Sequence, residues 1–66
     1  MKLNQLLAEG RARKKITLRA LEAKIGISNA VISQIETGYI VEPSFRNVVK
    51  IAKALEIPMS KVFEAE

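Results

Sequence analysis

The sequence contains no cysteine and no histidine. These two absences exclude disulfides, thiolate nucleophiles, imidazole acid–base catalysis and zinc sites built from the usual ligands. Aromatic residues make up only 5% of the chain, and no apolar run reaches the roughly 18 residues that a membrane-spanning helix needs. The first residues include a lysine but no continuous apolar segment, so we expect no secretory signal. The sequence therefore predicts a cytoplasmic protein with no membrane association, cofactor, metal ion or small-molecule ligand.

The length of 66 residues suits one domain, and we expect residues 1–66 to form a single one without repeats or linkers. Apolar residues make up 48% of the chain, which is sufficient for a small helical core. Eleven lysines and arginines against seven acidic residues give a net charge of +4, which is compatible with nucleic acid but weak support by itself. No pair of carboxylates stands out as a catalytic centre, so we predict that the protein is not an enzyme.

Residues 17–38 show the most informative pattern in the chain. Apolar residues recur there at helical spacing in two groups: Leu18, Leu21 and Ile25, then Ile32 and Ile35. Gly26 lies between the groups and can adopt the left-handed conformation that ends a helix, while Ser28 is a good N-cap for the next helix. Two helices joined by so short a turn cross at a steep angle, which is the helix-turn-helix arrangement.

The same reasoning predicts helices over residues 4–13, 18–25, 29–37 and 45–55, and a last helical turn from residue 59 or 60 to 63. Gly38 ends the third helix, and Ser44 is the expected N-cap of the fourth. Gly10 lies inside the first helix, where it costs about 1 kcal/mol relative to alanine. Either another helix approaches closely at Gly10 or the glycine is merely tolerated. We therefore predict a compact, five-helix, all-α bundle.

The outward side of residues 29–37 carries small and neutral polar side chains: Asn29, Ala30, Ser33, Gln34 and Thr37. Asparagine and glutamine can form two hydrogen bonds with adenine, serine can bond to several bases, and alanine can contact the thymine methyl group. Such a surface suits insertion into the major groove of DNA. The alternative is a polar helix face that is simply solvated.

The start of the helix over residues 18–25 is a candidate for phosphate contact. Thr17 is its expected N-cap, and Arg19 lies in its first turn, where backbone amides point outward. In the helix-turn-helix arrangement the first helix lies across the sugar–phosphate backbone. The alternative is that Thr17 only caps the helix and that Arg19 is solvated.

Several short motifs occur in an order and spacing that resemble one known family. They are Ile16-Thr17, Leu21, Gly26-Ile27-Ser28, Ile32-Ser33, Ile35-Glu36 with Gly38, Pro43-Ser44, and the segment from Ile51 to Leu55. From about residue 7 to 63 the chain resembles the Cro and phage-repressor (XRE-like) type of helix-turn-helix DNA-binding domain. The resemblance implies a lambda-repressor-like fold that binds operator DNA, usually as a dimer on a pseudo-palindrome, with residues 29–37 as the recognition helix.

The resemblance also implies roles for individual residues. It implies base reading by Asn29, Ala30, Ser33 and Gln34. The residues that we expect to contact phosphate are Thr17, Arg19, Thr37 and Tyr39. The tyrosine would bond to a phosphate through its hydroxyl. The family's paired arginine and glutamate correspond to Arg11 and Glu36, whose ion pair would orient the first helix against the recognition helix. The alternative is an exposed, unpaired Arg11.

Three positions depart from the family pattern. Leu18 replaces a glutamine whose amide contacts phosphate in many relatives. Glu22 replaces a small alanine, so either its stem lies along the joint with its carboxylate reaching solvent or a basic partner, or the two helices cross more widely. The loop after the recognition helix reads Tyr39-Ile40-Val41-Glu42, where relatives are often basic or polar.

Apolar residues in that loop and near the end of the chain are candidates for a homodimer contact, because a bundle of 66 residues is not expected to bury them all. They are Ile40, Val41, Pro58, Met59, Val62 and Phe63. The alternative, that they complete the core, suits Val62 and Phe63 better than Ile40 and Val41.

These observations together predict a sequence-specific regulator of transcription that binds double-stranded DNA. We expect a repressor that binds a pseudo-palindromic operator as a dimer. The alternative is an antitoxin or anti-repressor type of module on the same fold, whose polar helix binds a protein.

Overall fold

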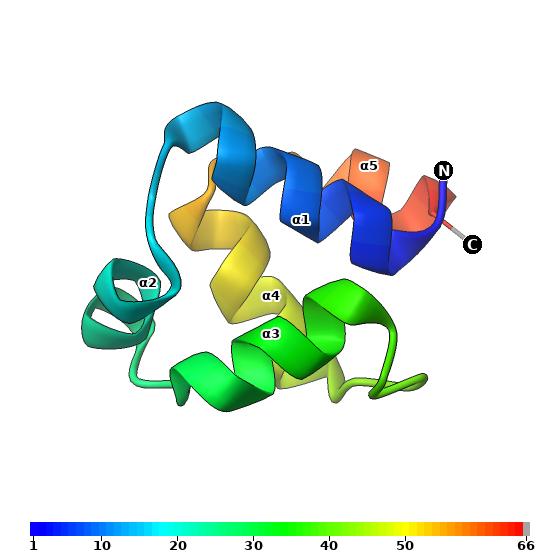
Figure 1. Ribbon diagram of the computed structural model, residues 1–66. Coiled ribbons are helices and arrows are strands. Elements are labelled where there is room, and N and C mark those ends of the chain that lie inside the picture. The colour runs from blue at the N-terminus through cyan, green and yellow to red at the C-terminus, as the bar shows by residue number, and fades with distance from the viewer. Residues whose placement is uncertain (66) are drawn as a thin grey trace.

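The computed structural model describes residues 1–65, which form five α-helices connected by short segments (Figure 1). The helices are α1 (Leu3–Lys14), α2 (Leu18–Ile25), α3 (Asn29–Thr37), α4 (Phe45–Ala54) and α5 (Met59–Glu64). No strand occurs within the described residues, and the predicted all-α fold is confirmed. Small differences concern the helix ends: α1 is one residue longer at each end than predicted, and α4 ends before Leu55, which is its C-cap.

Three of the helices begin at a hydroxyl side chain. Before α2, Thr17 Oγ1 accepts a hydrogen bond from the Ala20 amide at 3.0 Å. Ser28 and Ser44 cap α3 and α4 in the same way, with distances of 3.2 and 3.1 Å to the amides three residues later. Each bond satisfies an amide that has no partner inside its helix and contributes about 1 kcal/mol. These local bonds determine where α2, α3 and α4 start.

Glycine ends both helices of the helix-turn-helix unit. Gly26 and Gly38 have φ angles of 75° and 86°, in the left-handed region that a side chain disfavours. The amide of Gly26 donates to the Glu22 carbonyl oxygen at 2.8 Å, which closes the last turn of α2. In Figure 1, α2 is seen nearly along its axis while α3 lies across the view, so the two helices cross steeply.

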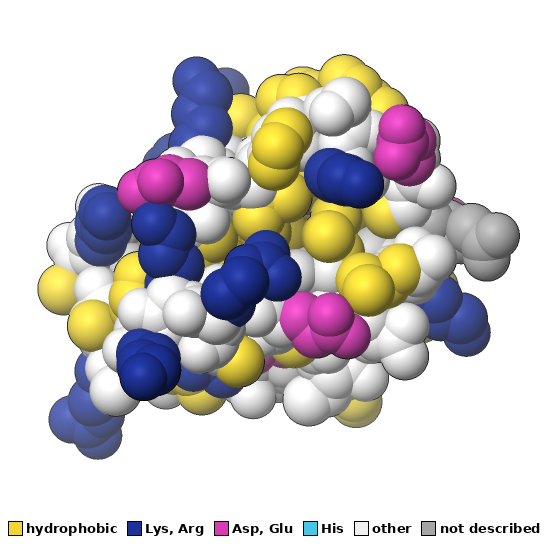
Figure 2. Space-filling model, turned by 90° about the horizontal axis from the view of Figure 1, so that it is seen from above, with side chains coloured by type: hydrophobic (Ala, Val, Ile, Leu, Met, Phe, Trp, Pro, Cys, Tyr) yellow, Lys and Arg dark blue, Asp and Glu magenta, His cyan; other side chains and the backbone are white. Residues whose placement is uncertain are grey.

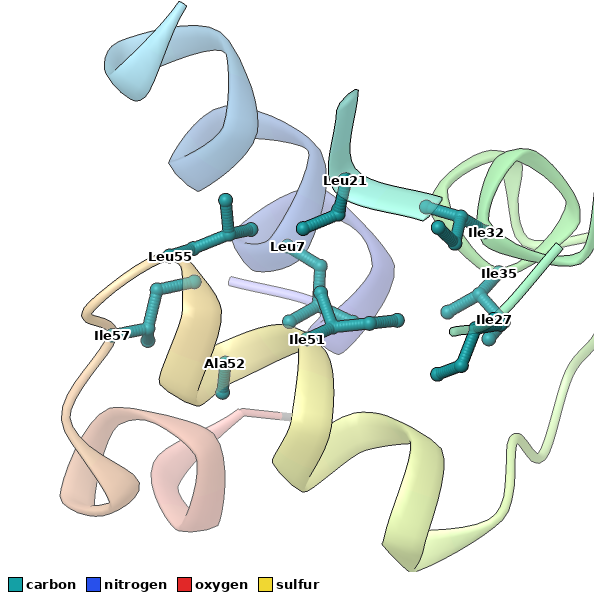
Figure 3. Packing of buried hydrophobic residues seen from close by; sticks show 9 residues of the cluster. All are labelled: Leu7, Leu21, Ile27, Ile32, Ile35, Ile51, Ala52, Leu55 and Ile57. Carbon is teal, nitrogen blue, oxygen red and sulfur yellow. The ribbon is translucent and has the colours of Figure 1, made fainter. Parts of the chain in front are cut away.

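The core lies where α1, α2, α3 and α4 meet (Figure 3). Its largest fully buried side chains are Leu7, Leu21, Ile32, Ile35 and Ile51. The connecting segments contribute as well, because Ile27 follows α2 and Ile57 precedes α5, and both are buried. The turn between α2 and α3 is therefore anchored to the same core as the helices on either side of it.

Gly10 of α1 is buried against Ile57. A Cβ atom built on Gly10 would lie 2.6 Å from Ile57 Cδ1 and 3.2 Å from Ile57 Cγ1. Of the two alternatives that the sequence left open, the structure shows a close approach, although the neighbour is not a helix. The neighbour is the segment between α4 and α5, which folds back over α1 because Ile57 inserts into the core.

The helices pack so that α3 rests on α1 and α2, while α5 contacts α4. Both ends of the described chain lie on the same side of the molecule, near α5 (Figure 1). In residues 1–65 no helix combines the length and the apolar character needed to cross a bilayer. Over the same residues no three acidic side chains gather into a group that could hold a metal ion.

Candidate nucleic-acid interface

Helix α3 has a buried side and an open polar side. Ile32 and Ile35 are 0% and 2% exposed and form part of the core. The predicted base-reading residues lie on the other side, with Ala30 and Gln34 exposed and Asn29 and Ser33 half-buried. We call these four residues the α3 ridge. None of them is buried, so the ridge is at least partly open to solvent along its length.

A side chain from α2 contacts the first residue of the α3 ridge. Asn29 Nδ2 donates a hydrogen bond to Glu22 Oε1 at 2.7 Å, and both residues are half-buried. The Glu22 carboxylate therefore binds a neutral amide of α3, and no basic side chain within residues 1–65 forms an ion pair with it. Sequence reasoning missed this contact. Its signal was a donor and an acceptor on opposite sides of the glycine turn, a pattern too common to identify one pair.

The predicted phosphate-contact residues, Thr17, Arg19, Thr37 and Tyr39, are all exposed. The Thr17 hydroxyl accepts from the Ala20 amide and still carries a hydrogen that it can donate to a second partner. The Thr37 hydroxyl donates to the Gln34 carbonyl oxygen at 3.3 Å. Tyr39 is 78% exposed in the segment after α3. Thr17 and Arg19 lie at the start of α2, and Thr37 and Tyr39 lie at or just after the end of α3. The four residues are thus at the two ends of the helix-turn-helix unit.

Arg11 of α1 and Glu36 of α3 form an ion pair with two hydrogen bonds. Arg11 Nε lies 2.7 Å from Glu36 Oε2, and Arg11 Nη2 lies 2.9 Å from Glu36 Oε1. The hydrogen bond to Glu36 raises the pKa of Arg11 above its ordinary value, against the opposing effect of burial. The alternative of an unpaired Arg11 does not describe this structure.

Two further hydrogen bonds extend this connection. Arg11 Nη1 donates to the Ile16 carbonyl oxygen at 2.9 Å, which ties the pair to the segment before α2. Asn4 Nδ2 donates to the Glu36 carbonyl oxygen at 3.2 Å, which ties the start of α1 to the last turn of α3. Because α3 is held from α1 at two places, the α3 ridge is presented in a fixed orientation.

The predicted dimer residues fall into two groups. Val41 and Phe63 are 83% and 71% exposed, and Pro58 is also exposed. The others, Ile40, Met59 and Val62, are half-buried and pack against the core. The sequence made Phe63 a better candidate for the core than Ile40. The structure shows the reverse, because Ile40 packs against the core and Phe63 is exposed.

A hollow of about 410 Å³ lies between α1 and α5. Figure 2 shows apolar side chains on its floor and lysine or arginine side chains nearby. Leu6 of α1 lines it together with Ile57 and Pro58, and Arg13 and Lys61 line it as well. The apolar surface around the start of α5 therefore continues onto α1.

Comparison with known proteins supports the helix-turn-helix arrangement of α2 and α3. The family model described as helix-turn-helix matches residues 7–62. The HTH-type transcriptional regulator SlrR of Bacillus subtilis (strain 168) is similar to this chain, with 32% identity over 56 residues. That match covers 85% of this chain and 37% of SlrR, so the chain corresponds to well under half of that relative. No solved structure matches the chain significantly.

Proposed function

Because this chain belongs to the helix-turn-helix family, we propose that it is a regulator of transcription that recognises a specific sequence in double-stranded DNA. Helix α3 is the recognition helix and lies in the major groove. The observation that carries the proposal is the open, neutral polar ridge of α3, whose opposite side is anchored by Ile32 and Ile35. Residues 1–66 act as one DNA-binding domain, with the helix-turn-helix unit at residues 17–38.

The α3 ridge reads bases through amides, a hydroxyl and a methyl group. Gln34 is exposed and can donate to N7 and accept from N6 of one adenine, while Asn29 can do the same at a second base pair. Ser33 can donate to or accept from a base edge, and Ala30 can pack on a thymine methyl group. Because α1 holds α3 through Arg11 and Asn4, little ordering of the helix is needed when DNA binds.

Phosphate contacts supply most of the affinity. From the start of α2, Arg19 and the Thr17 hydroxyl contact the sugar–phosphate backbone of one DNA strand. At the other end of the unit, Thr37 and Tyr39 contact the DNA backbone beyond the end of α3. The net charge of +4 favours the approach to DNA in general, without choosing a sequence. Affinity and site choice thus come from different sets of residues.

The protein acts as a homodimer that represses transcription by occupying a pseudo-palindromic operator. The exposed apolar side chains Val41, Pro58 and Phe63 supply the dimer contact, with Ile40, Met59 and Val62 at its edge. Exposed valine and phenylalanine side chains are costly to leave in water, which favours their burial against a second subunit. Two-fold symmetry of the dimer then matches the symmetry of the operator.

The second candidate function is that of an antitoxin or anti-repressor module. The exposure of Val41 and Phe63 supports it as well, because a different protein can cover the same side chains. Purification in the presence of nuclease separates the two candidates. A heterologous partner that stays bound without DNA favours the module, and a protein that elutes alone favours the regulator.

Selection of bound duplexes from a random pool tests the proposed function. We expect one enriched half-site, present twice with centres about one helical turn, or 10 base pairs, apart. Affinity for the selected duplex should fall steeply between about 50 and 200 mM salt, because phosphate contacts release counterions. A pool that stays random would show that the α3 ridge does not read bases. An affinity that salt does not change would show that phosphate contacts do not supply the binding energy.

A further inference from the structure

The hydrogen bond between Asn29 Nδ2 and Glu22 Oε1 joins the two helices of the helix-turn-helix unit at the edge of the α3 ridge. Within residues 1–65, ion pairs join Arg11 to Glu36 and Lys14 to Glu56, and neither involves Glu22. The partner of the Glu22 carboxylate is thus the amide of Asn29.

This contact determines which way the Asn29 amide faces. A carboxylate only accepts hydrogen bonds, so the NH₂ group of Asn29 has to point toward it. Rotating the amide by 180° would place the carbonyl oxygen Oδ1 against the carboxylate, where the two oxygens repel each other. The bond of 2.7 Å is also short and charge-assisted, which makes it stronger than a bond between neutral groups. The orientation of the Asn29 amide is therefore set before any DNA binds.

The fixed amide favours one base over its alternatives. Glu22 uses one N–H of Asn29 and leaves the second N–H and Oδ1 available. In the major groove, adenine presents an acceptor at N7 and a donor at N6. A free N–H beside a free carbonyl oxygen is complementary to these two groups. Guanine presents two acceptors, N7 and O6, so that Oδ1 would face another acceptor. The negative charge of Glu22 opposes guanine further, because O6 and N7 are electron-rich.

We propose that Glu22 is a positioning residue of α2 that holds the Asn29 amide in this orientation and thereby sets a preference for adenine at the base pair that Asn29 faces. The inference rests on the proposed function of α3 as a recognition helix. It places one determinant of sequence choice outside that helix, on a side chain that itself touches no base.

Four variants test the inference: Glu22→Ala, Glu22→Gln, Asn29→Ala and the double variant Glu22→Ala/Asn29→Ala. Their dissociation constants are measured on the selected duplex and on duplexes with each other base pair at one position. That position is the base pair at which the Asn29→Ala variant no longer prefers one base over the others. We expect Glu22→Ala to reduce the preference for adenine about three- to tenfold, a part of what a two-bond base contact contributes. Glu22→Gln should keep most of the preference, because its Oε1 can accept the same bond.

The double variant distinguishes positioning from a general effect on the fold. In the Asn29→Ala background, Glu22→Ala should leave the base preference unchanged, because the amide that Glu22 positions is gone. A loss that persists in this background, or one that is equal on all four base pairs, would overturn the inference while leaving the proposed function intact. If the unaltered protein selects no sequence, the proposed function and the inference fail together.

A second readout needs no DNA. In the free protein, the side-chain amide proton resonances of Asn29 should shift in Glu22→Ala and stay near their original positions in Glu22→Gln. Melting temperatures of both variants show whether the fold is kept. Asn29 resonances that do not respond to Glu22→Ala in a folded protein would also overturn the inference.

Discussion

The guanidinium of Arg11 and the carboxylate of Glu36 are joined by hydrogen bonds of 2.7 and 2.9 Å, although α2 and two turns separate them in the chain. The two partners are not equally covered, because 24% of the Arg11 side chain and 7% of the Glu36 side chain are exposed. Removing one partner therefore has different consequences from removing the other.

Arg11→Met should destabilise the protein more than Glu36→Gln. The first change leaves a buried carboxylate without its counter-charge, which costs about 3 kcal/mol. The second leaves a partly hydrated guanidinium that can still bond to the glutamine oxygen, at a cost of about 1 kcal/mol. The double variant Arg11→Met/Glu36→Leu should recover much of the loss, because no charge remains buried. Urea unfolding measures all three, and equal losses in the two single variants would contradict this account.

Gly10→Ala should destabilise the protein by about 1 kcal/mol, although alanine is the better helix former. The new methyl group would lie 2.6 Å from Ile57 Cδ1, so a buried side chain has to move. We estimate a strain of about 2 kcal/mol, which exceeds the gain of about 1 kcal/mol in helix propensity.

The Ile57→Val background tests whether this clash is the cause. Valine lacks Cδ1, so Gly10→Ala should become neutral or stabilising there, measured relative to Ile57→Val alone. Thermal or urea unfolding of the four proteins gives the coupling free energy. The same loss in both backgrounds would assign the effect of Gly10→Ala to something other than Ile57.

Gln34→Ala should weaken binding to the selected duplex by about 1–3 kcal/mol, because it removes a two-bond contact with one base. Binding to random DNA should not change, since that binding depends on phosphates. Gln5→Ala is the matched control, because Gln5 is an exposed glutamine on α1, outside the α3 ridge. Titrations on both kinds of DNA decide the matter. An equal loss on selected and random DNA would show that Gln34 does not read bases.

Arg19→Ala should weaken binding to every sequence and make it less sensitive to salt. Loss of one phosphate contact should reduce the slope of log affinity against log salt by about 1. Lys53→Ala controls for the change in net charge, because Lys53 is an exposed cation on α4 and belongs to neither helix of the helix-turn-helix unit. The expectation would be wrong if Arg19→Ala left the salt slope at its original value.

Glu56 should titrate below its ordinary pKa of 4.5. Its carboxylate accepts a hydrogen bond from Lys14, with Nζ and Oε2 2.7 Å apart. That bond and the charges of Lys14 and Lys24 lower the pKa of Glu56. Since the folded pKa is lower than the unfolded one, the pair stabilises the fold above about pH 4.5, and this contribution is lost as the pH falls through the lowered folded pKa.

Carboxyl NMR titration of the unaltered protein and of Lys14→Met measures this effect. The Glu56 midpoint should move back toward 4.5 in the variant, and also in high salt, because the pair is exposed to solvent. A midpoint that is the same with and without Lys14 would show that the pair does not persist in solution.

The positions of the helices follow from the sequence by itself. Thr17, Ser28 and Ser44 each bond to an amide three residues later, and Gly26 and Gly38 adopt the backbone angles that end a helix. These are interactions between neighbours in the chain, so residue types at short spacing are sufficient to predict them. The apolar spacing of Ile32 and Ile35 predicts in the same way which side of α3 is buried.

Only the tertiary structure decided which loop residues are buried and which residues of different segments meet. Ile40 and Val41 are adjacent and chemically alike, yet the first packs on the core and the second is 83% exposed. Glu22 meets Asn29 across a turn, and Gly10 meets Ile57 from the far end of the chain. The DNA-contact roles of the α3 ridge stay predictions. Periodicity within a helix says which side is apolar, but contacts across the core depend on the relative position of whole helices, which only the folded chain determines.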